Sequence, residues 1–385
     1  MIDCDAFYRQ LLANGIAHFV GVPDSLLKDL CACITNHSSA AGHVIAANEG
    51  AAIGLAAGYH LATGQASMVY MQNSGLGNTV NPLTSLADPE VYSIPLLLCI
   101  GWRGEPDVHD EPQHVKMGKV TLPLLKTLGI PFEILPDNLA EAETALQRAL
   151  HSMRARRAPY ALVVRKGTFA PCKLKREPAP EPPLSREAAI AQILQTLGDR
   201  AVIVSTTGMA SREVFELREK SGTGHHLDFL TVGSMGHASQ IALGVAQWRP
   251  GLAVYCLDGD GALLMHLGAL PIIGSLQPRN FKHIVLNNGA HDSVGGQPTA
   301  ALAIRIPEIA RACGYKSARS VEDPAALAEA LRELQACDGP ALLEVRVRKG
   351  ARSDLGRPTT SPVENKQDFM NFLAAAPPPA GSAAT

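Results

Sequence analysis

Residues 259–288 read GDGALLMHLGALPIIGSLQPRNFKHIVLNN, and this stretch decides the fold. An apolar run leads into Gly259, and a second apolar run ends at Asn287, 27 positions after Asp260. Each run has the length and composition of a buried strand, and the pattern of residues 262–277 between them is helical. The stretch therefore predicts two neighbouring parallel strands that are joined by one helix.

Polar side chains stand where both of these strands end. Ligands of open α/β sheets bind beyond the carboxyl ends of the strands, and Asp260 and Asn287 occupy such ends. A carboxylate, an amide oxygen, a backbone carbonyl and phosphate oxygens together form the hard oxygen shell that suits Mg²⁺. Gly259 and Gly261 let phosphate approach the backbone, and the helix start at Ala262 offers free N–H groups. Two ordinary strand-to-helix turns with Asp and Asn caps are the alternative.

The same alternation of short apolar runs and helical patterns extends along the whole chain. It predicts an α/β fold with two doubly wound parallel sheets, each covered on both faces. A segment rich in proline and charge interrupts the pattern, which then restarts. The expected parts are a first domain at 1–167, a linker at 168–186, a second domain at 187–350 and a C-terminal extension at 351–385. In the extension, the polar segment 352–366 is predicted to be a solvated tail, and the end, from about Ala374, to be disordered.

Composition narrows the classes of function. The 385 residues are 46% hydrophobic and 18% charged, with a formal net charge of −2, which motivates neither nucleic-acid binding nor attachment to an anionic membrane. The sequence contains no run of 18 apolar residues, so no membrane span is predicted. The N-terminal residues lack the pattern of a signal peptide. The eight cysteines are scattered without a CxxC pair, which predicts a reduced, cytoplasmic protein without disulfides.

The full spacing, GDG followed by NN at a second strand end, resembles the cofactor motif of the thiamine-diphosphate-dependent decarboxylases. The resemblance covers residues 1 to about 350 and implies a pyrimidine-binding first domain and a diphosphate-binding second domain. It also implies that Asp260, Asn287 and the backbone carbonyl of Gly289 hold Mg²⁺ against thiamine diphosphate. The middle domain of most family members is missing here, and the linker stands in its place.

Two further stretches agree with this resemblance. Family members end a strand of the first domain with a glutamate that opens a small-residue helix, and Glu49 has this position in VIAANEGAAIGLAAGYHLATG. The family pattern makes Glu49 the carboxyl group that shifts the cofactor pyrimidine to its reactive tautomer. Without the GDG–NN pattern, Glu49 would be interpreted as an ordinary helix N-terminal charge. The same resemblance places Met235 under the bent cofactor and the carbonyl of Gly233 against its amino group.

The turn that contains Thr206, Thr207 and Gly208 ends an earlier strand. Its hydroxyl and N–H groups are predicted to bind the diphosphate.

Substrate contacts are predicted in four loops. Asp24 and Ser25 follow the first strand, and the resemblance assigns them to catalysis, with Ser25 also binding the substrate carboxylate; a helix cap is the alternative. Gln72 and Asn73 are predicted to line the cleft from the pyrimidine side, although a simple polar turn also fits. In GWRGEPDVHDEPQHVKMG (101–118), Arg103 is the predicted partner of an anionic substrate because guanidinium groups match phosphonate oxygens. The other candidates in this loop are His109, His114 and Lys116.

The fourth loop, NNGAHDSVGGQPT (287–299), follows the metal site. His291 is predicted to move protons or donate to anionic oxygen, and Ser293 to contact the substrate. A turn with a capping histidine is the alternative.

The chain resembles the phosphonopyruvate and sulfopyruvate decarboxylase branch of the family in two loops, 101–118 and 287–299, and in its short two-domain form. The resemblance implies decarboxylation of 3-phosphonopyruvate to phosphonoacetaldehyde and CO₂, with sulfopyruvate decarboxylation, another thiamine-dependent decarboxylation or carboligation, and a catalytically inactive subunit as alternatives. Family members bind the two ends of one cofactor with different chains, which implies at least a homodimer with active sites at the interface. The expected partners are a small 2-oxo acid and a second copy of the chain, with no nucleic acid and no membrane.

Overall fold

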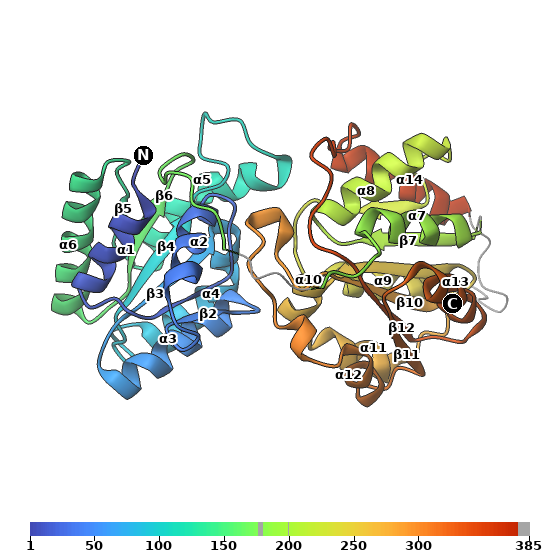
Figure 1. Cartoon of the computed structure of the whole chain (residues 1–385), viewed down its shortest axis with the longest axis horizontal. Coiled ribbons are helices and arrows are strands. Elements are labelled where there is room, and N and C mark those ends of the chain that lie inside the picture. Colours follow the sequence, from blue (N-terminus) through green and yellow to red (C-terminus); the bar gives the residue numbers. More distant parts are fainter. Residues whose placement is uncertain (176–179, 199, 376–385) are drawn as a thin grey trace, which may run out of the picture. The chain divides into compact units, whose positions relative to one another are not determined.

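The computed structural model describes residues 1–175, 180–198 and 200–375, and the chain divides into two compact units. Unit 1 comprises Met1–Pro178 with His291–Pro298, and unit 2 comprises Ala179–Ala290 with Thr299–Thr385. The division after residue 178 falls inside the predicted linker. Each unit is a sheet between layers of helices (Figure 1).

Unit 1 contains a six-stranded parallel sheet in the order β2-β1-β3-β4-β6-β5. The strands are β1 (Phe19–Gly21), β2 (His43–Ile45), β3 (Ser67–Gln72), β4 (Leu96–Gly101), β5 (Phe132–Ile134) and β6 (Tyr160–Val164). The helices are α1 (Cys4–Ala13), α2 (Lys28–His37), α3 (Glu49–Thr63), α4 (Leu76–Pro82), α5 (Pro112–Thr127) and α6 (Leu139–Arg156), with the short turns η1 (Asn73–Gly75) and η2 (Leu83–Ala87).

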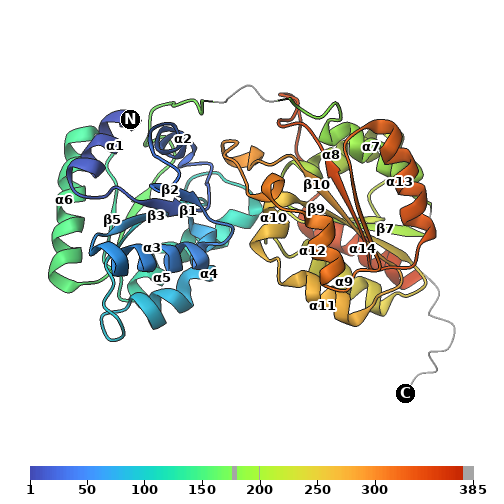
Figure 2. The same cartoon turned by 60° about the horizontal axis from the view of Figure 1, so that its bottom comes forward.

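The residues of β3 show why helices cover both faces of this sheet. Met68 and Tyr70 pack with α1, α2 and α6, whereas Val69 and Met71 point to the other side and pack with α3, α4 and α5. All four side chains are fully buried, and each such burial stabilises the fold by about 1.5–3 kcal/mol. Figure 2 shows the two layers of helices on opposite sides of the sheet.

Unit 2 repeats the same topology in the order β11-β12-β10-β9-β7-β8. Its strands are β7 (Ala201–Ser205), β8 (Asp228–Leu230), β9 (Ala253–Gly259), β10 (Phe281–Asn287), β11 (Ser317–Val321) and β12 (Ala341–Arg346), all parallel. Its helices are α7 (Arg186–Thr196), α8 (Met209–Ser221), α9 (Ala238–Trp248), α10 (Asp260–Met265), α11 (Ala269–Leu276), α12 (Ile306–Ala312), α13 (Pro324–Ala336) and α14 (Pro362–Ala375); the short turns η3 (Asp292–Val294) and η4 (Ala301–Ala303) follow β10.

The two strand orders are identical when each unit is numbered from its own first strand, because both become 2-1-3-4-6-5. In each unit the order reverses between the first and third strands, β1 and β3 or β7 and β9. Such a reversal is where open α/β sheets bind ligands. Helices α7, α8 and α13 cover one face of the second sheet, and α9, α11 and α12 cover the other (Figure 2). The prediction of two doubly wound parallel sheets is confirmed.

The prediction of a single helix over residues 262–277 is wrong. The segment forms α10 and α11, and His266 between them has non-helical dihedral angles (φ −132°, ψ 50°). Pro271 supplies a physical reason: it has no N–H for the carbonyl of Leu267 and its ring would clash there, so a continuous helix is unfavourable. As the third residue of α11, Pro271 leaves no hydrogen bond unmade.

The C-terminal extension is more ordered than a solvated tail. Helix α14 buries Phe369 against unit 2. Its buried Asn365 accepts a hydrogen bond from the Leu230 N–H and donates to the Asp228 carbonyl, so that it satisfies the edge of β8. The predicted disorder near the end falls mostly on residues 376–385, outside the described residues.

The predicted linker is ordered at both ends. Phe169 is buried and pairs with Ile2, and Arg186 begins α7 and forms a buried ion pair with Glu213. The linker is therefore shorter than 168–186, and residues 176–179 lie outside the described residues. Within the described part of the chain, no helix is both long and apolar enough to cross a bilayer.

Candidate functional site

Asp260 and Asn287 end neighbouring strands, as the sequence predicts. Leu286 of β10 pairs with Gly259 of β9, which brings the two turns to the same edge of the sheet. The Asp260 carboxylate is 3% exposed and accepts a hydrogen bond from the Thr299 hydroxyl. Burial raises the pKa of this carboxyl to about 6 because desolvation disfavours the charged form. Among the described residues no Lys, Arg or His side chain forms an ion pair with Asp260, so a bound cation would supply the missing charge.

The Asn287 side chain is fully buried and oriented from both sides. Its Nδ2 donates to Glu344 Oε1 over 2.7 Å, and its Oδ1 accepts from the Gly289 N–H over 3.0 Å. The Glu344 carboxylate thereby fixes which end of the amide faces the turn, and Oδ1 keeps a second lone pair. Gly289 has a φ of +65°, which suits glycine. A carboxylate, an amide oxygen and the local carbonyls at one sheet edge fit Mg²⁺.

Replacing Glu344 tests this orientation. Glu344→Ala removes the acceptor for Asn287 Nδ2, and loss of such an outer partner typically weakens metal binding by about 10–100-fold. We expect a loss of that size in Mg²⁺-dependent binding of thiamine diphosphate, measured by titration calorimetry. Glu344→Gln keeps an acceptor oxygen and is expected to stay within about threefold of the native affinity. Equal losses in both variants would contradict the orienting role.

The other predicted cofactor residues of unit 2 occupy the same edge of the sheet. Thr206, Thr207 and Gly208 follow β7, and Gly208 (φ +96°) immediately precedes α8. Gly233 and Met235 lie in the loop between β8 and α9, where Ser234 (φ 51°) and Gly236 (φ +86°) make a tight turn.

Gly236 explains why this loop can come close to the GDG turn. A side chain at Gly236 would collide with the His266 ring and the Ala262 carbonyl. The backbone of the Met235 loop therefore packs directly on α10, and no other residue type fits at Gly236 without rearrangement. Gly259, Gly261 and Ala262 adjoin Asp260 at the start of α10.

In unit 1, Glu49 is the first residue of α3 and its side chain is buried. The N-cap Asn48 accepts from the Gly50 N–H, which fixes the start of the helix. Asn78 Nδ2 donates to Glu49 Oε2 over 2.7 Å, and a side chain at Gly75 would collide with the carboxyl group. Sequence reasoning missed Gly75 and Asn78, although both lie in the polar stretch after β3.

Asp24 lies in a buried network beside Ser25. It accepts from Gln72 Nε2 over 2.7 Å and from the Leu26 N–H over 2.8 Å. Burial raises the pKa of this carboxyl, although the Gln72 and backbone hydrogen bonds oppose the shift. A side chain at Gly101 would overlap with Asp24 Oδ2, so the sequence leaves room for the carboxyl. The geometry makes Asp24 a group that fixes the loop of Ser25, and its catalytic role stays a prediction.

Arg103 is brought to Ser25 and held there. Its Nη1 donates to Ser25 Oγ over 2.8 Å, while Nε and Nη2 both donate to Asp110. Asp110 also accepts from the Gly104 and Glu111 N–H groups. One edge of the guanidinium group is thus fixed, and Nη1 and the Ser25 hydroxyl form a donor pair that suits an anion.

Asn73 holds the backbone of Arg103 in place. It has no exposed surface, its Nδ2 donates to the Arg103 carbonyl and to Thr121 Oγ1, and its Oδ1 accepts from the Arg103 N–H. These bonds make Asn73 a positioning residue for Arg103, and its direct contact with substrate stays a prediction.

His291 and Ser293 lie in a closed turn after the metal site. The His291 N–H donates to the Gln297 carbonyl, and the His291 carbonyl accepts from the Gly296 N–H. Burial lowers the pKa of His291 to about 4, so the imidazole is neutral at pH 7. Ser293 is exposed. A neutral imidazole has one hydrogen-bond donor and one acceptor, but no contact in the turn assigns it to catalysis.

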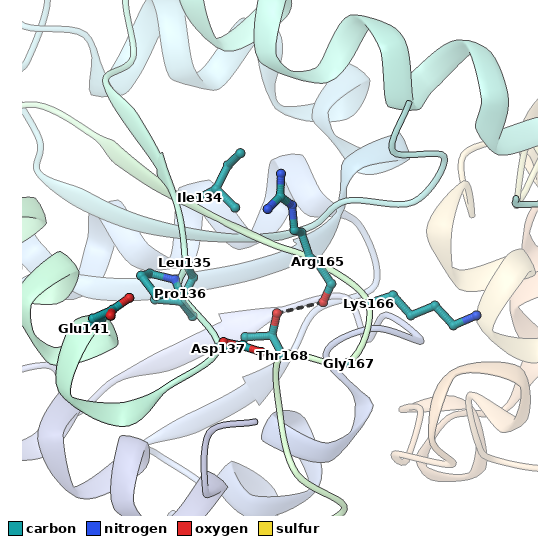
Figure 3. Close-up of a pocket in the computed structure, with 9 residues that line it drawn as sticks. All are labelled: Ile134, Leu135, Pro136, Asp137, Glu141, Arg165, Lys166, Gly167 and Thr168. Atoms are coloured by element: carbon teal, nitrogen blue, oxygen red, sulfur yellow. Dashed lines mark hydrogen bonds between the residues drawn. The ribbon is translucent and has the colours of Figure 1, made fainter. Parts of the chain in front are cut away.

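A pocket in unit 1 lies apart from the predicted residues. It is lined by the last residue of β5, by residues that follow β5 and β6, and by one residue of α6, namely Ile134, Leu135, Pro136, Asp137, Glu141, Arg165, Lys166, Gly167 and Thr168 (Figure 3). Inside it the Thr168 hydroxyl donates to the Arg165 carbonyl, and Arg165 forms an ion pair with Glu105. None of the residues predicted for cofactor or substrate lines this pocket.

Comparison with known proteins agrees with the geometry. A family model described as the N-terminal TPP binding domain of thiamine pyrophosphate enzymes matches residues 4–121, and the corresponding C-terminal TPP binding domain matches residues 206–345. A phosphonopyruvate decarboxylase from Streptomyces viridochromogenes is 37% identical over 399 residues, covering 100% of this chain and 97% of that protein. The chain belongs to this family of thiamine pyrophosphate enzymes.

Two further relatives extend the match. A phosphonopyruvate decarboxylase from Streptomyces hygroscopicus is 35% identical over 388 residues, covering 97% of this chain and 94% of that protein. A sulfopyruvate decarboxylase from Methanosarcina acetivorans is 29% identical over 343 residues, covering 83% and 85%. The predicted family and its cofactor, thiamine diphosphate, are confirmed, and the sulfopyruvate enzyme is the weaker match. Mg²⁺ and the individual site residues stay predictions.

Proposed function

We propose that the chain decarboxylates 3-phosphonopyruvate to phosphonoacetaldehyde and CO₂ with thiamine diphosphate and Mg²⁺. The observation that carries this proposal is the match to two phosphonopyruvate decarboxylases over essentially the whole chain. The fixed Arg103–Ser25 pair supports it because a phosphonate is a polyanion that suits guanidinium and hydroxyl donors.

The residues of this chain have separable tasks in the proposed reaction. Thiamine diphosphate supplies the carbon nucleophile and the electron sink that a 2-oxo acid needs to lose CO₂. Asp260, Asn287 and the Gly289 carbonyl are assigned to Mg²⁺, with Thr206, Thr207 and Gly208 at the diphosphate. Glu49 is the residue that would exchange a proton with the pyrimidine ring of the bound cofactor.

The remaining task is to orient the substrate. Arg103 and Ser25 bind the anionic groups of the substrate. Asn73 positions Arg103 through hydrogen bonds to its backbone, and Asp24 fixes the loop of Ser25. The bond between the carboxylate and the keto carbon breaks and CO₂ leaves. A proton then binds to the former keto carbon in place of the carboxylate, which gives the aldehyde. His291, a neutral imidazole at pH 7, is the candidate hydrogen-bond donor to an anionic oxygen of the substrate.

Product identity tests the reaction. The holoenzyme is incubated with phosphonopyruvate and followed by phosphorus NMR and CO₂ release. Phosphonoacetaldehyde and CO₂ in equal amounts are expected. A larger carboligation product, or release of inorganic phosphate in place of the aldehyde, would overturn the assignment.

Arg103→Lys tests how the substrate is gripped. Lysine keeps the charge but cannot make the paired bonds to Asp110. Loss of a hydrogen bond to a charged group costs about 1.5–3 kcal/mol, so kcat/KM for phosphonopyruvate is expected to fall by roughly 10–150-fold. Pyruvate, which has no phosphonate, is expected to be affected less. The control is Arg148→Lys, since Arg148 also pairs with a carboxylate, Glu133, but at the surface. Equal losses for both substrates would place Arg103 away from the phosphonate.

We also propose that the active form is at least a homodimer. Helix α3, which begins with Glu49, exposes Leu55 (46%) and Leu61 (76%), and nothing lies within 4 Å of the positions where side chains at Gly54 and Gly58 would begin. A helix with an apolar, small-residue outer face is suited to close packing against a partner. Sedimentation of the holoenzyme is expected to show a dimer or larger assembly, and an active monomer would contradict this proposal.

A further inference from the structure

A buried lysine and a cysteine are in contact in unit 2, at the opposite end of β10 from Asn287. Lys282 is the second residue of β10 and is 3% exposed. Cys337 is the C-cap of α13 and is partly exposed. Lys282 Nζ lies 3.6 Å from Cys337 Sγ and also donates to the Cys337 carbonyl. A primary amine and a thiol therefore lie side by side, although the two residues are 55 positions apart in the sequence.

Backbone and side-chain hydrogen bonds fix both partners. Lys282 pairs with residues of β9 and β12, so it lies in an interior strand of the sheet. The Cys337 N–H donates to the Glu333 carbonyl at the end of α13, and the Cys337 thiol donates to the Leu334 carbonyl over 3.4 Å. The sulfur lone pairs remain available to the amine. The contact thus belongs to the ordered core and not to a surface loop.

The amine has no carboxylate partner. Burial of an ammonium group is costly unless other groups compensate the charge, yet among the described residues no carboxylate forms an ion pair with Lys282. Asp338, which follows Cys337 in the sequence, pairs with Arg279 instead. The acceptors that Lys282 has are the carbonyl oxygen and the sulfur of Cys337. A proton that moves from this sulfur to the amine gives a thiolate beside an ammonium group.

A simpler role explains one of these contacts. Lysine side chains near the C-terminus of a helix commonly bind its last carbonyls, and this accounts for the hydrogen bond from Lys282 to the Cys337 carbonyl. Any residue type at position 337 would offer that carbonyl. The simpler role therefore does not require a thiol beside the amine. Among the eight cysteines, all of which lie in the described residues, Cys337 alone has a hydrogen bond to a lysine.

We propose that Cys337 and Lys282 form a peroxide-sensitive modification site, at which oxidation of the thiol leads to a covalent bond between Sγ and Nζ. Hydrogen peroxide first converts the thiol to a sulfenic acid and is itself reduced to water, so that the sulfur loses two electrons. Sulfenic acids condense with nitrogen nucleophiles to sulfenamides. The Lys282 amine attacks the sulfur, the S–N bond forms, the S–O bond breaks, and the hydroxyl group leaves with an amine proton as water.

The cross-link is reversible and lies away from the cofactor residues. Two thiols of a reductant return the two electrons, which restores the Cys337 thiol and the Lys282 amine and leaves the reductant as a disulfide. The bond joins the end of α13 to the start of β10. Like a disulfide between residues that are far apart in the sequence, it restricts the unfolded chain, so the site acts on stability and not on the decarboxylation step.

Peptide mapping tests the site without any measurement of activity. The full chain is treated with hydrogen peroxide, denatured, alkylated and digested with trypsin. Trypsin does not cleave after a modified Lys282, so the expected product joins peptide 280–305 to peptide 333–346, with their summed mass less two hydrogen atoms. Dithiothreitol should separate the two peptides and restore cleavage after Lys282.

Three variants show which residues are required. Cys337→Ser, at a partly exposed position, is expected to lose the cross-link completely. Lys282→Arg keeps the charge but lacks the nucleophilic amine, so Cys337 should stay a sulfenic acid that dimedone labels. Cys313→Ser changes another partly buried cysteine and should cross-link as the native chain does.

The native chain alone decides the proposal if a variant does not fold. The proposal fails if peroxide oxidises Cys337 in the native chain without joining the two peptides. It also fails if Cys337 stays reduced under conditions that oxidise Cys172 or Cys313, which are likewise partly buried. Equal dimedone labelling of Cys337 in folded native and Lys282→Arg chains would contradict the role of the amine.

Discussion

A Glu49→Gln chain is expected to bind thiamine diphosphate and to lose decarboxylation by roughly 10²–10⁴-fold, the range for loss of a general acid or base. Gln has nearly the shape of Glu, so packing against Gly75 and the hydrogen bond from Asn78 to the side-chain oxygen can persist. What would be lost is the proton that the proposed function assigns to exchange between this carboxyl and the cofactor. The measurement is kcat with saturating cofactor, beside cofactor affinity from titration calorimetry.

Two controls separate chemistry from folding. Glu90→Gln makes the same change at an exposed position and should leave kcat unchanged. Asn78→Ala keeps the Glu49 carboxyl but removes its partner, so kcat should fall by less than in Glu49→Gln. Full activity of Glu49→Gln would remove Glu49 from the reaction.

An Asp260→Asn chain is expected to lose Mg²⁺-dependent cofactor binding by more than about 100-fold, beyond the range for residues behind the ligands. The neutral amide can still accept the Thr299 hydroxyl, so the turn should keep its shape. Without cofactor, the variant should unfold at the same or a higher temperature than the native chain, because it removes a desolvated carboxylate. Asp368→Asn, an exposed position in unit 2, is the matched control. Unchanged Mg²⁺ dependence in Asp260→Asn would overturn the metal assignment.

The Asp260 carboxyl also gives this variant a distinct pH profile. Its folded pKa of about 6 lies above the ordinary 3.8, so in the cofactor-free native chain its contribution to stability is present at low pH and is lost as pH rises from about 4 to about 6. Metal binding has the opposite dependence because Mg²⁺ needs the carboxylate. Affinity should therefore fall by up to about tenfold per pH unit below pH 6, and Asp260→Asn should abolish this slope.

Local sequence patterns predicted the parts of the fold and site that depend on neighbouring residues. Helix α3 begins at Glu49 and ends before Gly64, whose φ of +72° makes it a left-handed cap, as VIAANEGAAIGLAAGYHLATG suggests. The ends of β9 and β10 at Asp260 and Asn287 follow from apolar runs that stop at polar residues. Such signals are contained in one strand, one turn and one helix.

The missed residues depend on strand order and long-range packing. Glu344 orients Asn287 although the two residues are 57 positions apart in the sequence. The reason is that β12, the last strand of the chain, lies next to β10 inside the sheet and not at its edge. No local pattern marks Glu344, which reads as a charge inside an apolar strand. Helix α14 was missed because few of its residues are buried, Phe369 and Asn365 among them.

The most direct test of the proposed function is cofactor-dependent CO₂ release with competing substrates. The purified chain, reconstituted with thiamine diphosphate and Mg²⁺, is offered phosphonopyruvate and sulfopyruvate separately, and kcat/KM is compared. A clear preference for phosphonopyruvate that disappears when cofactor is omitted is the predicted result. A preference for sulfopyruvate, or no CO₂ from either substrate with the cofactor bound, would contradict the proposed function.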